Sequence, residues 1–283
     1  MARGKGLRPL GGIKYRRARF AYGGFPPYVH GCYASTYFAL LQRLTGRTIC
    51  QLPARACTRG FFVFSGIVEE VGQITEITQT ADGCRLTIGA KKVVNPVNLG
   101  DSISVDGICL TVVSFDSNSF SVEAVLETMR RTKLGEKKVA DGVNLERAVT
   151  LNDRMGGHLV TGHIDAVATV SKVEDDGFSK LITFELPGEL APFFVPKGSV
   201  AIDGVSLTVV DCPVPKGDDN LYFSVALIPH TLDATTFKSL KPGVKVNIET
   251  DVIARYVARW LEPHLDEKLK KVAAKISSGV AKG

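Results

Sequence analysis

The chain contains an internal repeat of about 100 residues, and this repeat limits the fold more than any other feature of the sequence. The clearest pair is SVDGICLTVV at 104–113 and AIDGVSLTVV at 201–210, which lie 97 residues apart. Three further pairs lie 96 to 103 residues apart: FSGIV with VTGHI, VLETM with IPHTL, and VNLE with VNIE. Solenoid repeats are only ~20–50 residues long, so the pattern predicts a duplicated domain.

Each copy of the repeat is rich in predicted strands and turns. Segments such as Ile103–Val105 and Leu110–Phe115 are short, contain β-branched residues and are bounded by Gly, Asp or Ser. Asp-Gly turn signals recur through both copies. We interpret two of these aspartates, Asp106 and Asp203, as turn residues rather than catalytic acids. Short strands at this spacing predict a small closed antiparallel barrel in each copy.

The C-terminus has a different pattern, which predicts a helix from Asp251 to about Ser277. Pro263 interrupts it. Its first apolar face consists of Val252, Ile253, Tyr256, Val257, Trp260 and Leu261. An apolar face left over after two closed barrels has to be covered. Either its own barrel or a neighbouring subunit can cover it, and we favour the subunit.

The formal net charge of +6 does not indicate a nucleic-acid-binding body, because the excess charge lies at the front of the chain. Residues 1–60 contain 11 Lys and Arg and no acid; the first acid is Glu69. Subtracting these 11 from the chain's 35 leaves 24 bases against all 29 acids in residues 61–283. No apolar stretch reaches the ~18–20 residues of a membrane span, so neither nucleic acid nor membrane is an expected partner.

The acid-free, Arg-rich front end is typical of an organelle transit peptide. It contains a single serine, Ser35, whereas transit peptides are usually rich in serine. A disordered basic tail and a start codon placed too far upstream are the alternatives. The six cysteines form no CxxC pair and are too few for a disulfide scaffold.

The repeated motifs, taken together, resemble the riboflavin synthase family of tandem lumazine-binding domains. The resemblance runs from about Val63 to Leu261 and rests on ordered motifs: FSGIVEEVG, SVDGICLT, ETMRRTKLG, NLERA, GGHLVTGHID, IDGVSLT, IPHTL and NIETD. It implies an all-β fold of two tandem, homologous six-stranded antiparallel Greek-key barrels plus a C-terminal α-helix. The barrels would span 63–159 and 160–250, and the helix 251–283.

The family usually opens with Met-Phe-Thr-Gly-Ile-Val, where this chain has Val63 and Ser65 at the Met and Thr positions. Residues 1–62 are therefore an addition before the usual start. This supports a cleaved leader and localisation to a plastid (chloroplast) or another organelle, with the cytoplasm as the alternative.

The resemblance implies the dismutation of two 6,7-dimethyl-8-ribityllumazine molecules to riboflavin and 5-amino-6-ribitylaminouracil. That reaction requires no cofactor and no metal. The family also implies a homotrimer, whose active site lies between the first barrel of one subunit and the second barrel of the next, and an association with lumazine synthase.

Six polar side chains match the family's catalytic positions: Ser102, Cys109, His163, Ser206, Thr208 and Asp251. We expect Ser102, Cys109 and His163 to take part in proton transfer or nucleophilic addition at the first barrel. Asp251 would orient or charge a neighbouring group. Cys109 could also be a small buried strand residue. We expect a structural role for His158, because the sequence shows no third ligand for a metal pair with His163.

The substrate-binding positions divide into two expected pockets. The first would be lined by Gly66, Ile67, Val68, Cys109, Leu110, Thr111, Glu123, Ala124, Val125, Leu126, Glu127 and Thr128. The second would be lined by Gly162, His163, Ile164, Lys197, Ser206, Leu207, Thr208, Leu227, Ile228, Pro229, His230, Thr231 and Leu232. Strand-end backbone groups and threonine hydroxyls suit the polar edge of a pteridine, and apolar neighbours suit its faces.

Two other functions are compatible with parts of this pattern. A non-catalytic lumazine or flavin carrier of the same fold is the first, but a carrier need not keep reactive groups in both barrels. A flavin-reductase-type barrel is the second, but it needs a nucleotide-binding unit, and the sequence contains neither GxGxxG nor a P-loop.

Overall fold

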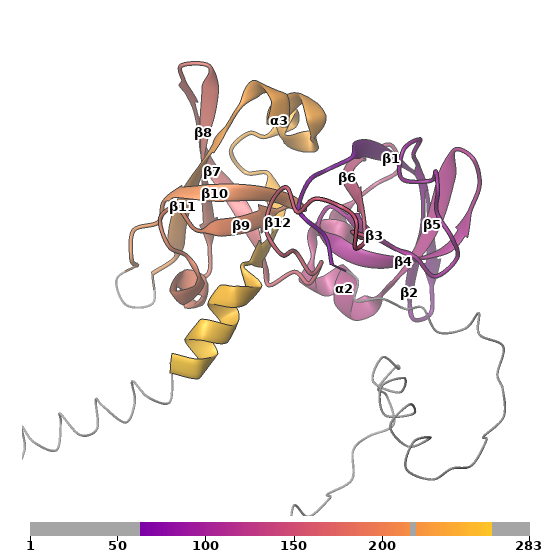
Figure 1. Cartoon of the computed structure of the whole chain (residues 1–283), viewed down its shortest axis with the longest axis horizontal. Helices are drawn as coiled ribbons and strands as arrows, with labels where there is room; N and C mark the ends of the chain where they lie inside the picture. Colours follow the sequence, from indigo (N-terminus) through magenta and orange to yellow (C-terminus); the bar gives the residue numbers. More distant parts are fainter. Residues whose placement is uncertain (1–62, 216–218, 262–283) are drawn as a thin grey trace, which may run out of the picture. The chain divides into compact units, whose positions relative to one another are not determined.

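The computed structural model describes residues 63–215 and 219–261 (Figure 1). The basic front end, residues 1–62, and the part of the expected C-terminal helix beyond Leu261 lie outside the described residues. Both barrels belong to one compact unit of the chain.

The first copy of the repeat forms a closed barrel of antiparallel strands in the order β1-β2-β5-β4-β3-β6. Its strands are β1 (Glu70–Thr80), β2 (Gly83–Gly89), β3 (Ser102–Val105), β4 (Ile108–Phe115), β5 (Ser119–Val125) and β6 (Gly142–Arg147). The second copy closes in the equivalent order, β7-β8-β11-β10-β9-β12. Its strands are β7 (Ala166–Asp176), β8 (Ser179–Leu186), β9 (Ser199–Ile202), β10 (Val205–Asp211), β11 (Leu221–Leu227) and β12 (Lys245–Thr250). The expected pair of six-stranded Greek-key barrels is confirmed.

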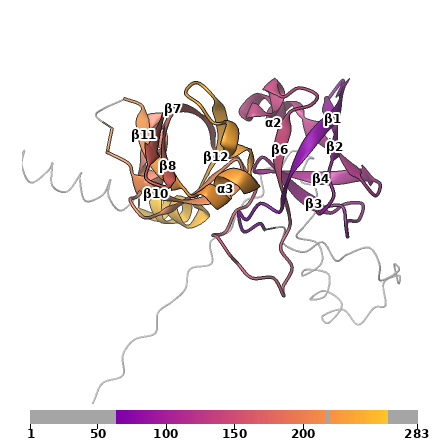
Figure 2. The ribbon, with the colours of Figure 1, turned by 90° about the horizontal axis from the view of Figure 1, so that it is seen from above.

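Alternating side chains fill each barrel, as the period of a β-strand requires. In β2, Cys84, Leu86 and Ile88 point inward and are buried, while Arg85 between them is exposed. Each barrel has its own apolar core. The second core includes stacked rings of Phe184 and Phe223, whose centroids lie 5.2 Å apart. The ring of β7, β8 and β12 around this core is open to view in Figure 2.

Short helices connect the strands at equivalent places in the two copies. The connection from β5 to β6 contains α2 (Leu126–Arg131) and the 3-10 helix η1 (Lys133–Glu136). The connection from β11 to β12 contains α3 (Pro229–Ala234) and the 3-10 helix η3 (Thr236–Ser239). A further 3-10 helix, η2 (Gly188–Phe193), lies between β8 and β9.

The segments that precede the two barrels pair with each other. Phe64 and Val160 form an antiparallel bridge, in which the backbone N–H of Phe64 donates to the carbonyl of Val160 over 2.8 Å. Both residues are fully buried, and they pack with Ala201 in a small third core. Beyond this bridge, each segment hydrogen-bonds to a strand of the other copy, Gly66 to Ser206 and Gly162 to Cys109. Contacts between the two copies therefore cross the expected boundary at residues 159–160.

Two hairpin turns bring the barrels into direct contact. Asp106 and Asp203 have φ angles of 46° and 45° and occupy the β3–β4 and β9–β10 turns, so their interpretation as turn residues is confirmed. A Cβ added to Gly107 would lie 2.7 Å from the backbone nitrogen of Gly204, and only glycine allows this approach. Both aspartates are also buried, and the ammonium of Lys133 bridges their carboxylates.

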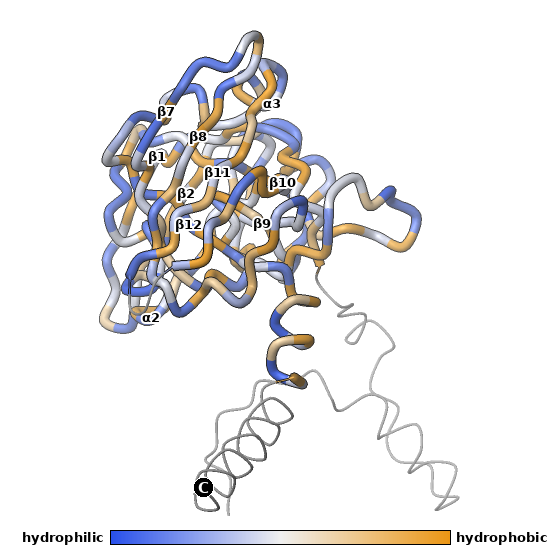
Figure 3. Tube along the Cα trace, turned by 90° about the vertical axis from the view of Figure 1, so that its left-hand side faces the viewer, coloured by the Kyte–Doolittle hydropathy of each residue, from blue (hydrophilic) through white to orange (hydrophobic). Residues whose placement is uncertain are grey.

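Residues 252–261 form the beginning of the expected C-terminal helix. Asp251 caps it, since its Oδ1 accepts a hydrogen bond from the backbone N–H of Ile253 over 2.8 Å. Ile253 and Tyr256 are 59% and 75% exposed, so the barrel-proximal part of the apolar face is open. Several positions along this helix are orange, and thus hydrophobic, in Figure 3. Among the described residues, no helix is long and apolar enough to span a membrane.

Candidate functional site

The first candidate site lies where β4 meets the opening turn of the second repeat. The backbone N–H of Cys109 donates to the carbonyl of Gly162 over 2.9 Å. Gly162 has a φ of +79°, and a Cβ at this position would lie 2.4 Å from the Cβ of Cys109. The turn Thr161–His163 therefore approaches the strand as closely as glycine permits, and His163 directly follows the glycine that contacts Cys109.

Ser102 and Cys109, both predicted site residues, interact through their side chains. They come from neighbouring strands, and Ser102 is paired directly with Thr111. Burial raises the pKa of the Cys109 thiol, a hydrogen bond from Ser102 lowers it, and the negative charge of Glu249 raises it. The thiol thus stays protonated at neutral pH and can serve as a proton donor or carrier. His163 is exposed, so its ring is open to a ligand.

The second candidate site repeats this arrangement with the two copies exchanged. The backbone N–H of Ser206 on β10 donates to the carbonyl of Gly66 over 2.8 Å. Gly66 has a φ of +76°, and a Cβ there would lie 2.6 Å from the Cβ of Ser206. Cys109 and Gly162 therefore correspond to Ser206 and Gly66, and each barrel wall is completed by the opening turn of the other repeat.

This exchange shows that parts of the two opening motifs contact the barrel other than the one to which the sequence assigned them. Gly66, Ile67 and Val68 were expected in the first pocket, but Gly66 contacts Ser206, and Val68 packs against the core of the second barrel. Conversely, the turn at Gly162 contacts Cys109, and Ile164 packs against the core of the first barrel. The sequence analysis grouped each opening motif with the strands that follow it. The periodicity of a sequence does not show that such a motif contacts the other barrel.

His158 lies in the second site, although the sequence favoured a purely structural role. Its Nδ1 lies 2.7 Å from the hydroxyl oxygen of Ser206, and its Nε2 is buried with no hydrogen-bond partner among the described residues. Burial lowers the pKa of His158, and the nearby charge of Asp251 raises it. The imidazole is therefore neutral at pH 7. It thus contacts one predicted catalytic residue, Ser206, and senses the charge of another, Asp251.

The other predicted residues lie on the strands and helices around these two contacts. Thr111 and Thr208 are exposed on β4 and β10. The segments 123–128 and 227–232 run from the ends of β5 and β11 into α2 and α3. Lys197 precedes β9 with a positive φ of 67°, and its backbone N–H donates to the carbonyl of Val209 over 2.8 Å.

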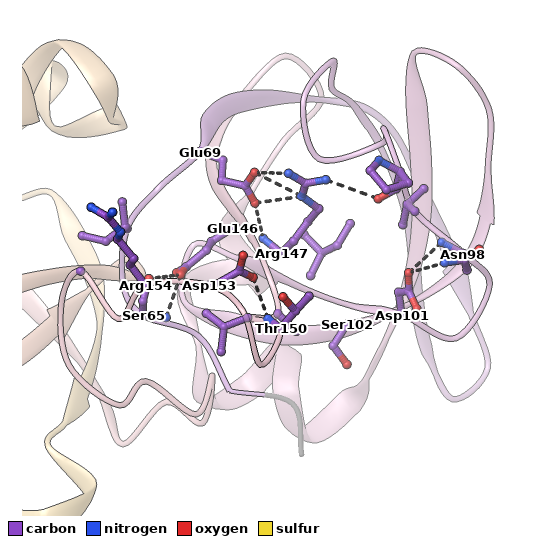
Figure 4. A pocket seen from close by; sticks show the side chains of 17 residues that line it. Ser65, Glu69, Asn98, Asp101, Ser102, Glu146, Arg147, Thr150, Asp153 and Arg154 are labelled. Carbon is purple, nitrogen blue, oxygen red and sulfur yellow. Dashed lines mark hydrogen bonds and ion pairs between the residues drawn. The ribbon is translucent and has the colours of Figure 1, made fainter. Parts of the chain in front are cut away.

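A pocket of about 660 Å³ opens beside β3 and β6 of the first barrel (Figure 4). Of the predicted site residues, Ser102 and Ile67 line it, while Cys109 and His163 do not. An ion pair between Glu69 and Arg147, 2.6 Å long, crosses one wall. The pocket thus combines apolar walls with charged groups, and it adjoins the first site through Ser102.

Two buried glutamates were missed by the sequence analysis. Glu146 and Glu249 end the repeated VNLE and VNIE motifs and are 4% and 1% exposed. Each accepts hydrogen bonds from the opening turn of one repeat: Glu146 from Ser65 and Gly66, Glu249 from Thr161 to His163. Their presence at the same place in two largely apolar strands could have revealed them. A buried carboxylate needs hydrogen-bond donors, so a repeated one indicates a repeated set of donors.

No group of three or more metal-ligating side chains occurs in the described part of the chain. The free cysteines there are Cys84, Cys109 and Cys212, and Cys84 and Cys212 are buried in the cores of the two barrels. Each of the two contacts described above places polar groups at the end of a strand.

The sequence model of the lumazine binding domain family matches the chain twice, at residues 65–148 and 161–251. These two matches coincide with the two barrels, and each begins at the opening turn that reaches the other barrel.

Curated relatives match over nearly their whole length. The riboflavin synthase of Actinobacillus pleuropneumoniae is 43% identical over 199 residues, which cover 70% of this chain and 90% of the relative. The riboflavin synthase of Bacillus subtilis is 38% identical over 213 residues, which cover 75% and 96% of the two chains.

Solved structures agree in fold. The structure of LumP complexed with 6,7-dimethyl-8-(1'-D-ribityl) lumazine has a TM-score of 0.57 and 25% identity, and covers 66% of this chain and 98% of that chain. The complex of LumP with riboflavin has the same TM-score and 26% identity. From the two family matches and the extent of the curated relatives, the chain belongs to the riboflavin synthase family of tandem lumazine-binding domains.

Proposed function

We propose that this chain is a riboflavin synthase, which converts two molecules of 6,7-dimethyl-8-ribityllumazine into riboflavin and 5-amino-6-ribitylaminouracil. One observation carries the proposal: the chain holds two equivalent sites, at Cys109–Gly162 and at Ser206–Gly66. Two equivalent sites suit a reaction whose two substrates are the same compound. Similarity to curated riboflavin synthases supports the same reaction.

The reaction transfers a four-carbon unit from one lumazine to the other. Both reactants are the same compound, so the atoms balance over the two products without an external oxidant or reductant. The protein has to orient two flat rings, remove a proton from the acidic C7 methyl group and supply a nucleophile to the acceptor ring. Orientation alone can contribute several kcal/mol to such a reaction.

In the first site, we assign the proton transfers and the addition to Ser102, Cys109 and His163. The hydroxyl of Ser102 and the thiol of Cys109 form a short polar chain at the strand end. The exposed ring of His163 adjoins this chain through the turn at Gly162. A neutral thiol and an accessible imidazole are suited to passing a proton at neutral pH.

In the second site, Ser206 and Thr208 present hydroxyl groups from β10, and His158 lies in contact with Ser206. Asp251 contributes negative charge close to His158 and also caps the C-terminal helix. These roles make Asp251 a group that orients and charges its neighbours, and His158 the hydrogen-bond partner of the Ser206 hydroxyl.

The assembly and the location of the enzyme belong to the proposal as well. A homotrimer would cover the exposed apolar face of the helix at 252–261, which includes Tyr256 and Trp260. In this trimer the first barrel of one subunit would face the second barrel of the next. The acid-free residues 1–60 support targeting to a plastid or another organelle. An association with lumazine synthase stays a prediction from the family.

A lumazine carrier is the second candidate, because the fold is similar to that of ligand-bound LumP. The retention of polar, chemically active groups in both barrels favours the enzyme. The full chain, purified and mixed with 6,7-dimethyl-8-ribityllumazine in the presence of a chelator, separates the two. Continuous formation of riboflavin, followed by its absorbance and fluorescence, supports the enzyme. Tight binding of lumazine without turnover makes the chain a carrier.

A further inference from the structure

We propose that Glu249 is a positioning residue for the first site, because its carboxylate holds the Thr161–His163 turn against Cys109. This inference rests on the proposed function, since it concerns the geometry of the same site. Glu249 ends the VNIE motif, and none of the catalytic and binding roles above involves a residue of this motif.

The carboxylate of Glu249 is enclosed by donors from a single turn. Its Oε1 accepts from the backbone N–H of Thr161 over 2.6 Å and from the hydroxyl of Thr161 over 2.7 Å. Its Oε2 accepts from the N–H groups of Gly162 and His163 over 2.8 and 3.2 Å. Four hydrogen bonds to one buried, ionised side chain fix the turn more firmly than bonds between neutral groups would.

This turn belongs to the site of the other barrel. Glu249 is a residue of β12 in the second barrel, whereas the carbonyl of Gly162 accepts from Cys109 on β4 of the first. A displacement of the carboxylate would therefore move one wall of the first site. Displacements of ~1 Å at a reacting centre can cost about a hundredfold in rate.

Arg255 of the helix at 252–261 also lies close to this carboxylate. Its guanidinium lies 3.8 Å from Oε1 of Glu249 and 3.1 Å from Oδ1 of Asp165. Asp165 in turn accepts from the backbone N–H and the hydroxyl of Thr250, over 2.8 and 2.7 Å. Both ends of the 161–165 segment are thus tied to the end of β12, and one arginine joins the two ties.

Glu249 also acts on Cys109 through its charge, which raises the pKa of the thiol in addition to the effect of burial. A glutamine would remove this charge and would turn an amide NH₂ group toward backbone N–H donors. Both effects favour the thiolate of Cys109, because the repulsion disappears and the loosened turn admits water.

The first repeat provides a matched control. Glu146 accepts from the backbone N–H and hydroxyl of Ser65, both over 2.7 Å, and from the N–H of Gly66 over 3.0 Å. Like Glu249 it is a buried carboxylate that holds an opening turn, but its turn contacts Ser206 in the second site. Glu146→Gln should therefore cost a similar amount of stability without changing the environment of Cys109.

The experiment compares the full-length wild type with Glu249→Gln and Glu146→Gln. The rate of Cys109 alkylation by iodoacetamide is measured against pH by peptide mass spectrometry, which separates Cys109 from the other cysteines. We expect the alkylation midpoint of Glu249→Gln to fall by about half a pH unit or more, while that of Glu146→Gln stays at the wild-type value. We also expect the kcat of Glu249→Gln to fall at least about tenfold.

An unchanged alkylation midpoint and a kcat within about threefold of wild type in a folded Glu249→Gln protein would overturn the proposal. If this variant does not fold, Thr161→Val removes one of the four bonds without changing the size of the side chain. Thr161→Val should then alter the alkylation profile of Cys109, and Ser65→Val should not; equal profiles overturn the proposal. Alkylation requires no turnover. An inactive wild type would therefore refute the proposed function, but the alkylation profiles would still show whether Glu249 positions the turn beside Cys109.

Discussion

The side-chain amide of Asn144 donates to the backbone carbonyl of Asp203 over 3.0 Å, so a side chain of the first barrel supports a turn of the second. Asn247 makes the equivalent bond to the carbonyl of Asp106 over 2.9 Å. Each asparagine also accepts from the backbone of the other copy, Asn144 from Thr236 and Asn247 from Lys133. The second residues of the VNLE and VNIE motifs thus join the two barrels reciprocally.

Asn144→Ala should destabilise the chain strongly, because it leaves the carbonyl of Asp203 and the N–H of Thr236 without partners in a buried interface. We expect a loss of about 2–3 kcal/mol in the free energy of unfolding, measured by urea titration. Asn220→Ala is the control, since the exposed Asn220 makes a surface hydrogen bond to Glu185, and its loss should cost less than about 0.5 kcal/mol. Equal losses for both variants would contradict the role of Asn144.

The stability of the chain should fall as the pH rises from about 4 to 6, through the ionisation of Asp203. Burial raises the pKa of Asp203 from 3.8 to about 6, against the attraction of Lys133. In this window the folded chain retains a proton that the unfolded chain has lost, so Asp203 contributes a slope of at most ~1.4 kcal/mol per pH unit. Asp203→Asn should remove this slope.

Urea titrations of wild type and Asp203→Asn at several pH values measure the difference between the two slopes. Asp106 does not confuse the result, because Lys133 and Lys137 hold its pKa below its usual value. If the free energy of unfolding of the wild type instead rose with pH relative to that of the variant, Asp203 would be ionised in the folded chain throughout this window.

Gly162→Ala should abolish most of the activity, because its methyl group would collide with the Cβ of Cys109. We expect a fall in kcat/KM of about a hundredfold. Gly177→Ala is the matched control: Gly177 also has a positive φ, +61°, but a Cβ there meets nothing within 4 Å. The control should lose only about 1 kcal/mol of stability and keep its activity. Similar kcat/KM values for the two variants would exclude a steric role for Gly162.

The imidazole of His158 should titrate below its usual pKa of 6.5, because burial disfavours its charged form. Asp251→Asn should lower this pKa further, since the variant removes the negative charge that favours the imidazolium. The ring proton shifts of His158, followed by NMR across pH 4 to 8, measure both values. His163→Gln provides a spectrum without the other histidine of this region. A rise of the His158 pKa in Asp251→Asn would refute the coupling.

The architecture could be predicted from the sequence because it follows from local patterns that are repeated. The copies at SVDGICLTVV and AIDGVSLTVV each specify a hairpin with an Asp-Gly turn, and both hairpins occur at β3–β4 and β9–β10. The apolar face of the C-terminal helix could also be predicted, because its apolar residues recur in the sequence with the period of a helix.

The partners of the opening turns could not be predicted in the same way. Gly66 and Gly162 were recognised as equivalent, but a repeat shows which residues correspond and not which ones touch. Their contacts with Ser206 and Cys109 depend on the packing of the two barrels, which the buried Asn144, Asn247 and Lys133 determine. The roles of Glu146 and Glu249 were missed for the same reason, because their donors lie about 80 residues away in the chain.

The mass balance of the reaction tests the central claim most directly. The full chain is incubated with a known amount of 6,7-dimethyl-8-ribityllumazine in the absence of air, metal and nucleotide, and all three compounds are quantified by chromatography. A riboflavin synthase yields one riboflavin and one 5-amino-6-ribitylaminouracil for every two lumazines consumed. Consumption without riboflavin, or riboflavin without an equal amount of the uracil product, would contradict the account of two equivalent lumazine sites acting together.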